Sequence, residues 1–491
     1  MKFASVLVVF LLLQAATITP PRTWDEEALR EWATPIAALN ARPGHFSEAE
    51  YLRAPIDDLR TYPVYMPGRE PAGYFEMIRT VGPKPIIEPN TLKTADDWVR
   101  AGQRVFREYD VPGFRVFDPK IIAAVRLAES FTGSNVSIRE DGTFPDLRWV
   151  PTSKGLALGL INCAGCHTRK MPDGTFIDGP SGNENGSNLG KFNLAPWGSS
   201  PIELPGDSPA LAVWRSWAAP WIPNDVHEPI KTMTPQQFGP LFGTGAALGL
   251  FPRWNGSGYY TTKIPDLIGF KDRKYIDHTA THQHRGPGDV MRYAALVTYS
   301  DSSDFGSYRM LTDAQRKIPV RASDAALYAL AQYIYSLQPP PNPNLSDPRI
   351  ATGQRLFQRE GCAGCHTPPL YTNNKLTLAQ GFTPPAEHRQ LLDIMSISVG
   401  TDPSLAMKTR KGTGYYKVPS LKGVWYRGRY LHDGALRTLE EMFNPARVQD
   451  DFVPSGFMPL GQKTRAIKGH EFGLKLAEDE RAALLAFLRS L

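Results

Sequence analysis

The sequence predicts a mainly α-helical chain built from two similar units with long loops, the first enlarged by insertions. Three observations lead to this prediction. One motif, Cys-Ala-Gly-Cys-His, occurs twice. The segments before and after it are also repeated, with apolar residues at helical spacing. The 491 residues include 44 prolines and 42 glycines while 21% are charged, a balance that favours ordered loops around helices over a disordered chain.

The first residues have the layout of a secretory signal peptide. Met1 and Lys2 precede an apolar run over residues 3–13, and Ala15 and Ala16 follow as small residues. We expect a signal peptide over residues 1–16 and a periplasmic or secreted protein, with a buried N-terminal helix as the alternative. No later apolar stretch reaches the roughly 18 residues of a membrane span, so we expect no stable membrane insertion.

The rest of the chain divides into a leading segment and two units. Residues 17–97 are rich in proline and lack a long helical period, so we expect them to wrap the units that follow. We expect the first unit over residues 98–338 and the second over residues 347–491. A proline-rich linker over residues 339–346 separates them.

The two units share an order of parts. Residues 101–106 match residues 352–357 as an opening helix, and residues 329–337 resemble residues 483–491 as a closing helix. The first unit carries about fifty extra residues before its motif and a Gly/Asn-rich loop over residues 178–193. Inserted loops are where a scaffold usually acquires its function.

The repeated motif supplies all four cysteines of the chain. The copies are Cys163, Cys166 and His167, and Cys362, Cys365 and His366. Two thiols one helical turn apart can add to the vinyl groups of haem, and the adjacent imidazole can bind its iron. We therefore expect two covalently bound haem c groups with His167 and His366 as proximal iron ligands. A Cys₄ zinc site would leave the repeated histidine unexplained. Dithiol redox motifs occur in a βαβ context that this chain lacks.

The state of each iron would decide the function. An iron that only transfers electrons keeps both axial positions filled by His or Met, whereas a catalytic iron leaves one position free for peroxide or dioxygen. Two unequal units suggest one haem of each kind. The net charge of +6 is mild for this length and predicts no nucleic-acid partner.

Three further stretches resemble the bacterial di-haem cytochrome c peroxidase and MauG superfamily. Residues 416–424 read YKVPSLKGV, residues 429–434 read RYLHDG, and residues 438–441 read TLEE. With the two motifs, the resemblance covers roughly residues 90–491. It implies two cytochrome c folds packed face to face, a small-molecule oxidant (hydrogen peroxide or dioxygen), and an electron donor such as a small cytochrome or cupredoxin. By family analogy alone it also implies a calcium ion, although no loop has the carboxylate spacing of a calcium site.

The resemblance also concerns the sixth iron ligands. The enlarged first unit and residues 468–473 look more like the rubber-oxygenase branch than like peroxidases of the superfamily, which have a methionine ligand where this chain reads FNPAR over residues 443–447. We expect His470 as the sixth ligand of the second haem, with a surface-loop histidine as the alternative. His432 lies in the family motif as a ligand or, in the interpretation we favour, as a hydrogen-bonding residue near a haem propionate.

The enlarged unit contains the densest histidine cluster of the chain. Its members are Tyr275, His278, His282, His284 and Arg285, and we expect them on the distal face of the first haem. A neutral imidazole there could accept a proton from peroxide, and Arg285 could stabilise developing negative charge. By family position, Tyr275 would be a redox-active or gating aromatic. The alternative is a solvated loop whose imidazoles bond to the backbone.

The leading hypothesis is an exported di-haem oxidoreductase with peroxide or dioxygen chemistry at the first haem and electron transfer through the second. The rival is an electron-transfer cytochrome with two six-coordinate irons. A third hypothesis is a MauG-like enzyme that oxidises a partner protein. Trp214, Trp217 and Trp221 recur at helical spacing and would serve as an electron relay, line a substrate channel or pack in the core.

Overall fold

The computed structural model describes residues 18–132, 137–183, 219–222, 233, 237, 249–251, 260–299, 304–309 and 320–491. The expected signal peptide and two of the three tryptophans, Trp214 and Trp217, lie outside these residues. Helices account for 32% of the residues and strands for 15%, so helix outweighs strand as predicted. In the described part of the chain, no helix has both the length and the apolar character needed to cross a bilayer.

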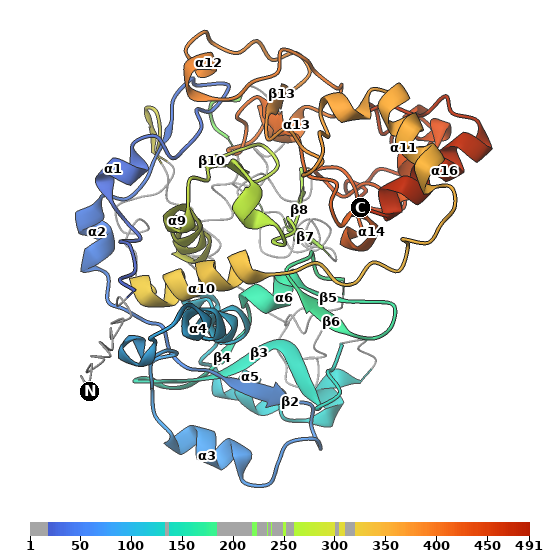
Figure 1. Ribbon diagram of the computed structural model, residues 1–491. Helices are drawn as coiled ribbons and strands as arrows, with labels where there is room; N and C mark the ends of the chain where they lie inside the picture. Colours follow the sequence, from blue (N-terminus) through green and yellow to red (C-terminus); the bar gives the residue numbers. More distant parts are fainter. Residues whose placement is uncertain are drawn as a thin grey trace, which may run out of the picture.

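The longer helices form the scaffold. They are α2 (Glu48–Arg53), α3 (Tyr74–Thr80), α4 (Ala95–Glu108), α5 (Pro119–Ala124), α9 (Pro287–Tyr299), α10 (Asp324–Ser336), α11 (Ile350–Arg359) and α16 (Glu478–Arg489). The shorter helices are α1 (Glu26–Leu29), α6 (Cys163–His167), α12 (His388–Leu391), α13 (Ser404–Met407), α14 (Val424–Arg427) and α15 (Leu439–Met442). Figure 1 shows α4 beside α10 in the lower half of the molecule and α11 beside α16 on the right.

The strands are short and pair antiparallel. They are β1 (Pro43–Gly44), β2 (Tyr62–Tyr65), β3 (Thr143–Thr152), β4 (Gly155–Gly159), β5 (Thr168–Lys170), β6 (Phe176–Asp178), β7 (Leu250–Phe251), β8 (Thr262–Lys263), β9 (Tyr275–Ile276), β10 (His282–Gln283), β11 (Asp304–Phe305), β12 (Tyr308–Arg309), β13 (Leu376–Leu378) and β14 (Tyr415–Lys417). The sheets follow the orders β2-β3-β4 and β1-β11-β12, and the other strands pair as β5-β6, β7-β8, β9-β10 and β13-β14.

In the first unit, the predicted opening and closing helices cross in direct contact. Helix α4 starts at a capping box in which Thr94 and Asp97 each accept the other's amide hydrogen. Its buried face meets α10 at Gly102, where a Cβ atom would lie 1.9 Å from the carbonyl oxygen of Ala329 and 2.7 Å from the Cβ of Tyr333. Only glycine allows the two backbones to approach this closely.

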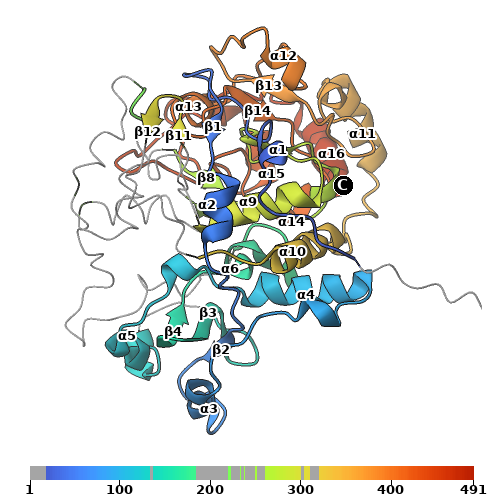
Figure 2. The ribbon, with the colours of Figure 1, turned by 90° about the vertical axis from the view of Figure 1, so that its left-hand side faces the viewer.

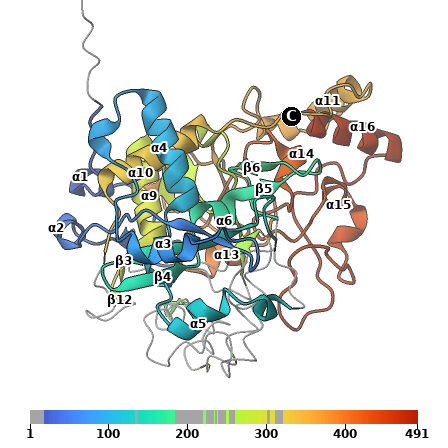
Figure 3. The ribbon, with the colours of Figure 1, turned by 90° about the horizontal axis from the view of Figure 1, so that it is seen from below.

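The second unit repeats this crossing. A Cβ atom on Gly353 of α11 would lie 2.0 Å from the carbonyl oxygen of Ala483 and 2.6 Å from the Cβ of Phe487 in α16. The glycine, the alanine and the aromatic residue four positions later thus recur in the same arrangement. Figure 3 shows the two helix pairs well apart, with α4 and α10 on one side of the molecule and α11 and α16 on the other. The shared packing supports an internal duplication.

The leading segment contacts both units. The amide of Thr23 donates to Asp324 at the start of α10 at 3.1 Å, and the amide of Ala37 donates to the carbonyl of Gly412 in the second unit at 2.7 Å. Strand β1 adds to β11, and β2 adds to β3. Figure 2 shows this segment in blue, running from β1 near the top, past α2, to β2 and α3 near the bottom. The leading segment thus contacts both units, while its wrapping role and the unit boundaries stay predictions.

Candidate functional site

The first motif forms its own short helix, α6. Asn162 caps this helix, because its side-chain oxygen accepts the amide hydrogen of Gly165 at 2.7 Å. Ala164 then packs into the hydrophobic core that contains α4 and α10. Burial lowers the pKa of His167 to about 4, although Asp266 and the nearby backbone of Gly179 oppose the shift. The imidazole is therefore neutral near pH 7, as binding to a metal requires.

The second motif begins in a 3₁₀ turn, η8 (Cys362–Gly364). His366 Nδ1 lies 3.1 Å from the carbonyl oxygen of Pro419 and 3.2 Å from that of Tyr371. Because a carbonyl oxygen only accepts hydrogen bonds, Nδ1 carries the proton and Nε2 presents its lone pair. A hydrogen bond of this kind orients a metal-binding imidazole and raises its basicity.

A cavity adjoins the second motif. Both cysteines and His366 line it, and most of the remaining lining is apolar, including Phe357, Val424, Leu439, Phe443, Leu484 and Leu488. Three cationic side chains also reach it, Lys263, Lys417 and Arg427, whereas no Asp or Glu of the described chain does. A largely apolar cavity with a few cations suits a flat apolar ring that carries carboxylates. The residues present therefore fit a haem.

His470 lies opposite His366 in this cavity. The two ring centroids are 6.2 Å apart and the ring planes are inclined at 63°. Two imidazoles on one metal ion, with metal–nitrogen distances of about 2 Å, have their ring centres roughly 6 Å apart. Burial, followed by the charge of His366, lowers the pKa of His470 to about 4, so this ring is neutral as well. Its Nδ1 is buried and has no hydrogen-bond partner among the described residues.

A fully buried arginine holds the loop that carries His470. Arg447 lies in the 3₁₀ turn η9 (Pro445–Val448), and its side chain has no exposed surface. Its guanidinium donates to the carbonyls of Gly469 at 3.0 Å and His470 at 2.7 Å, and also to those of Met442 and Ile467. His470 itself has a positive φ of 50°. The arginine thus fixes an uncommon backbone conformation at the candidate ligand.

His432 also lines this cavity. Its ring lies 4.8 Å from the ring of Tyr416, and burial lowers its pKa. Its Nδ1 is buried, and no residue within the described ranges hydrogen-bonds to it. The ring of His470 neighbours that of His366, whereas the ring of His432 neighbours that of Tyr416, and the hydrogen-bonding role of His432 stays a prediction.

The expected distal cluster is divided among separate environments. His278 lines the cavity of the second motif, where its Nε2 donates to the carbonyl of Lys263 at 3.0 Å. The hydroxyl of Tyr275 accepts the amide hydrogen of Asp393 at 2.9 Å, and its ring packs in a core with Leu376 and Tyr415 of the second unit. These two residues therefore lie where the units meet.

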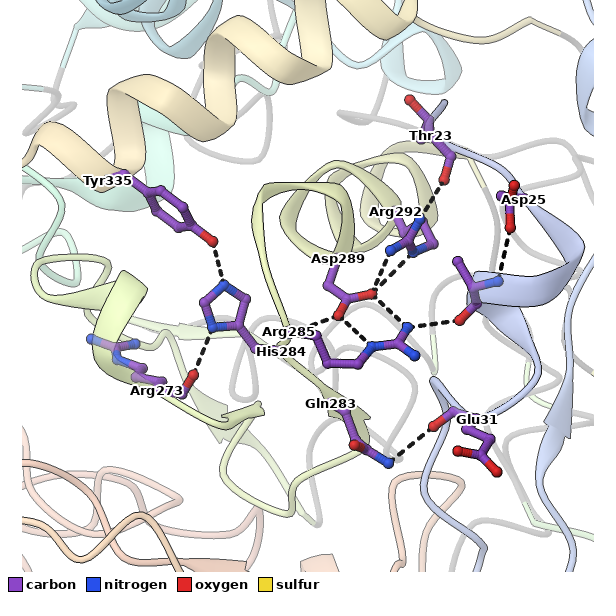
Figure 4. A network of polar contacts seen from close by, with 11 residues as sticks. Thr23, Asp25, Glu31, Arg273, Gln283, His284, Arg285, Asp289, Arg292 and Tyr335 are labelled. Carbon is purple, nitrogen blue, oxygen red and sulfur yellow. Dashed lines mark hydrogen bonds and ion pairs between the residues drawn. The ribbon is translucent and has the colours of Figure 1, made fainter. Parts of the chain in front are cut away.

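The other three members have structural contacts. His284 donates from Nδ1 to the carbonyl of Arg273 at 2.6 Å and accepts the hydroxyl of Tyr335 at Nε2 at 2.6 Å, as Figure 4 shows. Arg285 forms an ion pair with Asp289 at 2.9 Å and donates to the carbonyl of Ala28.

His282 packs 4.0 Å from the ring of Trp32 in the leading segment. These contacts place the five residues in different surroundings, and their role at a distal haem face stays a prediction. Trp221, the described member of the tryptophan stripe, packs against Phe305 and Tyr308.

Four residues in or next to the second cavity were not predicted from the sequence. Lys263, Lys417 and Arg427 line the cavity, and Arg447 holds its loop. Lys417 stands inside the family-like stretch of residues 416–424, so the pattern contained a signal. Nothing local marks Lys263, which comes from the first unit and reaches the cavity only through the tertiary structure.

Comparisons with known proteins give a partial match. No family model matches the chain. It is 27% identical over 203 residues to cytochrome-c peroxidase IdrP1 of Pseudomonas sp. (strain SCT), a match that covers 38% of this chain and 48% of that protein. The chain thus spans about half the length of the curated relative it matches. The similarity therefore covers part of both proteins, and the protein it points to is named as a cytochrome-c peroxidase.

Two solved structures overlap with parts of the chain. A hydrazine synthase of Kuenenia stuttgartiensis has a TM-score of 0.28 and 15% identity over 48% of this chain and 74% of that one. A MauG-like protein associated with microbial copper homeostasis has a TM-score of 0.22 and 19% identity over 37% of this chain and 57% of that one. TM-scores this low carry no argument about function.

Proposed function

We propose that this chain is an exported di-haem c-type oxidoreductase that uses peroxide or dioxygen at the haem of the first motif and passes electrons through the haem of the second. The observation that carries the proposal is the pairing of His366 with His470, whose 6.2 Å centroid separation suits two axial ligands. Among the described residues, no ring contact pairs His167 with another imidazole in this way. The identity to a cytochrome-c peroxidase supports the same class.

The cysteines of each motif would hold one haem, with His167 and His366 as proximal ligands. Bound haem supplies electron transfer where both axial positions of its iron are filled, and oxidant binding where one is free. The chain contributes the positions of the ligands. The Pro419 carbonyl holds the proton of His366 on Nδ1, Arg447 holds the loop of His470, and the apolar lining limits access of water to the second cavity.

Three finer parts of the proposal come from the sequence. The leader over residues 1–16 supports export to the periplasm or beyond. Residues 468–473, which carry His470, support a place in the rubber-oxygenase branch. A small cytochrome or cupredoxin would supply electrons to the second haem.

Electron paramagnetic resonance of the oxidised holoprotein tests the proposal. We expect a low-spin signal from the second haem and a high-spin signal from the first, since low-spin iron has two strong axial ligands. The high-spin haem should react with peroxide or dioxygen during turnover. Two low-spin signals that persist on partial reduction would instead establish the electron-transfer cytochrome.

A pair of variants assigns the low-spin haem. In His470→Gly the low-spin signal should become high-spin, and added imidazole should restore it by entering the space left by the side chain. His432→Gln serves as the matched control, because His432 lines the same cavity and its ring packs beside Tyr416. If the low-spin signal is lost in His432→Gln and kept in His470→Gly, His432 is the iron ligand and His470 is not.

A further inference from the structure

Two lysines from different units meet in the wall of the second cavity. Lys263 ends β8 in the first unit, and Lys417 ends β14 in the second unit. Lys263 is only 9% exposed, and both lysines are among the residues that line the cavity, together with Arg427. The second cavity is therefore not built by the second unit alone.

His278 fixes the two lysines relative to each other. Its Nε2 donates to the carbonyl of Lys263 at 3.0 Å, and its own carbonyl accepts the amide hydrogen of Lys417 at 3.0 Å. The amide of Lys263 also donates to the carbonyl of His432 at 2.8 Å. Because these contacts involve the backbone, the lysines keep their places whether or not their ammonium groups are paired.

The positive charge at this wall exceeds the negative charge beside it. Lys417 Nζ donates to the carbonyl of Tyr275 at 3.3 Å, and Lys263 Nζ has neither an ion pair nor a hydrogen bond within the described ranges. The nearby Asp266 is already held by Arg427 at 2.7 Å. Burial and neighbouring cations lower the pKa of each lysine to about 7. A buried cation is costly unless an anion accompanies it.

We propose that Lys263 and Lys417, with Arg427, form a carboxylate-binding site for the propionates of the second haem. The proposal rests on the haem assigned to this cavity under the proposed function. Haem carries two carboxylates on an otherwise apolar ring, and the cavity offers cations in an otherwise largely apolar lining. Ammonium and guanidinium groups are natural partners for carboxylates. The described residues that line this wall include three cations and no Asp or Glu, and the carboxylate of nearby Asp266 is already paired with Arg427, so the wall offers no free carboxylate to a calcium ion.

The site would also connect the two haems through the chain. Lys263 lies three residues before Asp266, whose charge acts on His167 of the first motif. One short segment thus carries a propionate partner for the second haem and a carboxylate near the proximal ligand of the first. Through Lys263, the first unit would contribute to the reduction potential of a haem attached to the second.

Spectroelectrochemical titration of the holoprotein tests the site. In Lys263→Met and Lys417→Met, the reduction potential of the low-spin haem should fall, because removal of a nearby cation favours the more positive ferric state. The double variant should fall further, and Lys263→Arg should return towards the wild-type potential. Lys422→Met is the control, since Lys422 is exposed and close to Lys417 in sequence.

The outcomes separate this inference from the proposed function. The low-spin haem of both Met variants could have the same reduction potential as in Lys422→Met, with the low-spin signal intact. In that case the carboxylate-binding site is wrong and the haem assignment stands. A shift confined to the high-spin haem would also overturn the site, because the lysines would then serve the other group. If the wild-type protein shows no low-spin haem, the failure lies with the proposed function. Haem content, measured in each variant, excludes loss of folding as the cause of a shift.

Discussion

At the scale of single residues, the second cavity is arranged by side chains that would not touch the iron. Pro419 offers a carbonyl to His366, and Arg447 donates to four carbonyls around the loop of His470. All four of these contacts are to backbone carbonyls, and the carboxylate of Glu471 adds a favourable charge nearby. The placement of His470 thus depends on a residue more than twenty positions away in sequence.

We expect Arg447→Met to release the His470 loop. The substitution leaves several buried carbonyls without donors, and each unsatisfied group costs about 1–3 kcal/mol. The free energy of unfolding should fall, and part of the low-spin haem signal should become high-spin, a change that added imidazole should reverse. Arg437→Met, at an exposed position, is the control. If the variant is destabilised but keeps its low-spin signal, Arg447 stabilises the fold without positioning His470.

At the scale of elements, each unit is organised by a helix crossing that glycine alone permits. Gly102 and Gly353 bring their helices within contact of the carbonyls of Ala329 and Ala483. The aromatic side chains of Tyr333 and Phe487 lie beside the two crossings. The repeated sequence pattern therefore encodes a repeated contact, which is stronger evidence for duplication than similar helices alone.

We expect Gly353→Val to separate α11 from α16. A side chain there would collide with backbone atoms that cannot move independently of the helix, so the cost should exceed the usual 1–3 kcal/mol of overpacking. Thermal unfolding followed at the low-spin haem should show a lower Tm. Gly113→Ala is the control, because a Cβ atom at Gly113 meets nothing within 4 Å. Equal Tm values for the two variants would contradict the close crossing.

At the scale of the whole molecule, the units are joined by buried polar contacts and by the leading segment. Lys411 of the second unit pairs with Asp277 of the first at 2.9 Å, with both side chains almost fully buried. The leading segment reaches the same region through His45, whose Nε2 lies 3.4 Å from that of His282. Three parts of the chain thus meet around two neutral imidazoles.

This meeting point should make the fold sensitive to acid. Burial lowers the pKa of His45 to about 4 and that of His282 well below its usual value. Between pH 6.5 and 4 the unfolded chain binds more protons than the folded one, so stability falls as the pH falls. For His45 the loss between pH 7 and 5 should be about 2 kcal/mol.

Chemical unfolding of wild type and His45→Phe at pH 7 and 5 measures this loss. The variant should lose less stability on acidification. Buried histidines away from His45 contribute equally to both proteins, whereas the pKa of His282 also rises when the neighbouring His45 is removed, which reduces the loss in the variant further. An equal loss in the two proteins would mean that His45 is already protonated in the folded state or remains accessible to water.

The sequence by itself determined the parts whose chemistry is local. Two thiols and an imidazole within five residues define each motif wherever the chain places it, and the repeated apolar spacing defines the helices α4, α10, α11 and α16. The sequence also singled out His470, although its role as a ligand stays a proposal.

Only the tertiary structure decided which distant groups meet, because contact between residues far apart depends on packing that no local pattern records. It brought His470 next to His366. It also separated the histidine cluster, with His278 in the lining of the second cavity and His282 and His284 in contacts with other parts of the fold. It also brought Lys263 from the first unit to the wall of the second cavity, beside Lys417. Buried charge needs a partner, and at that wall the described chain supplies more cations than carboxylates, since Asp266 is already paired with Arg427.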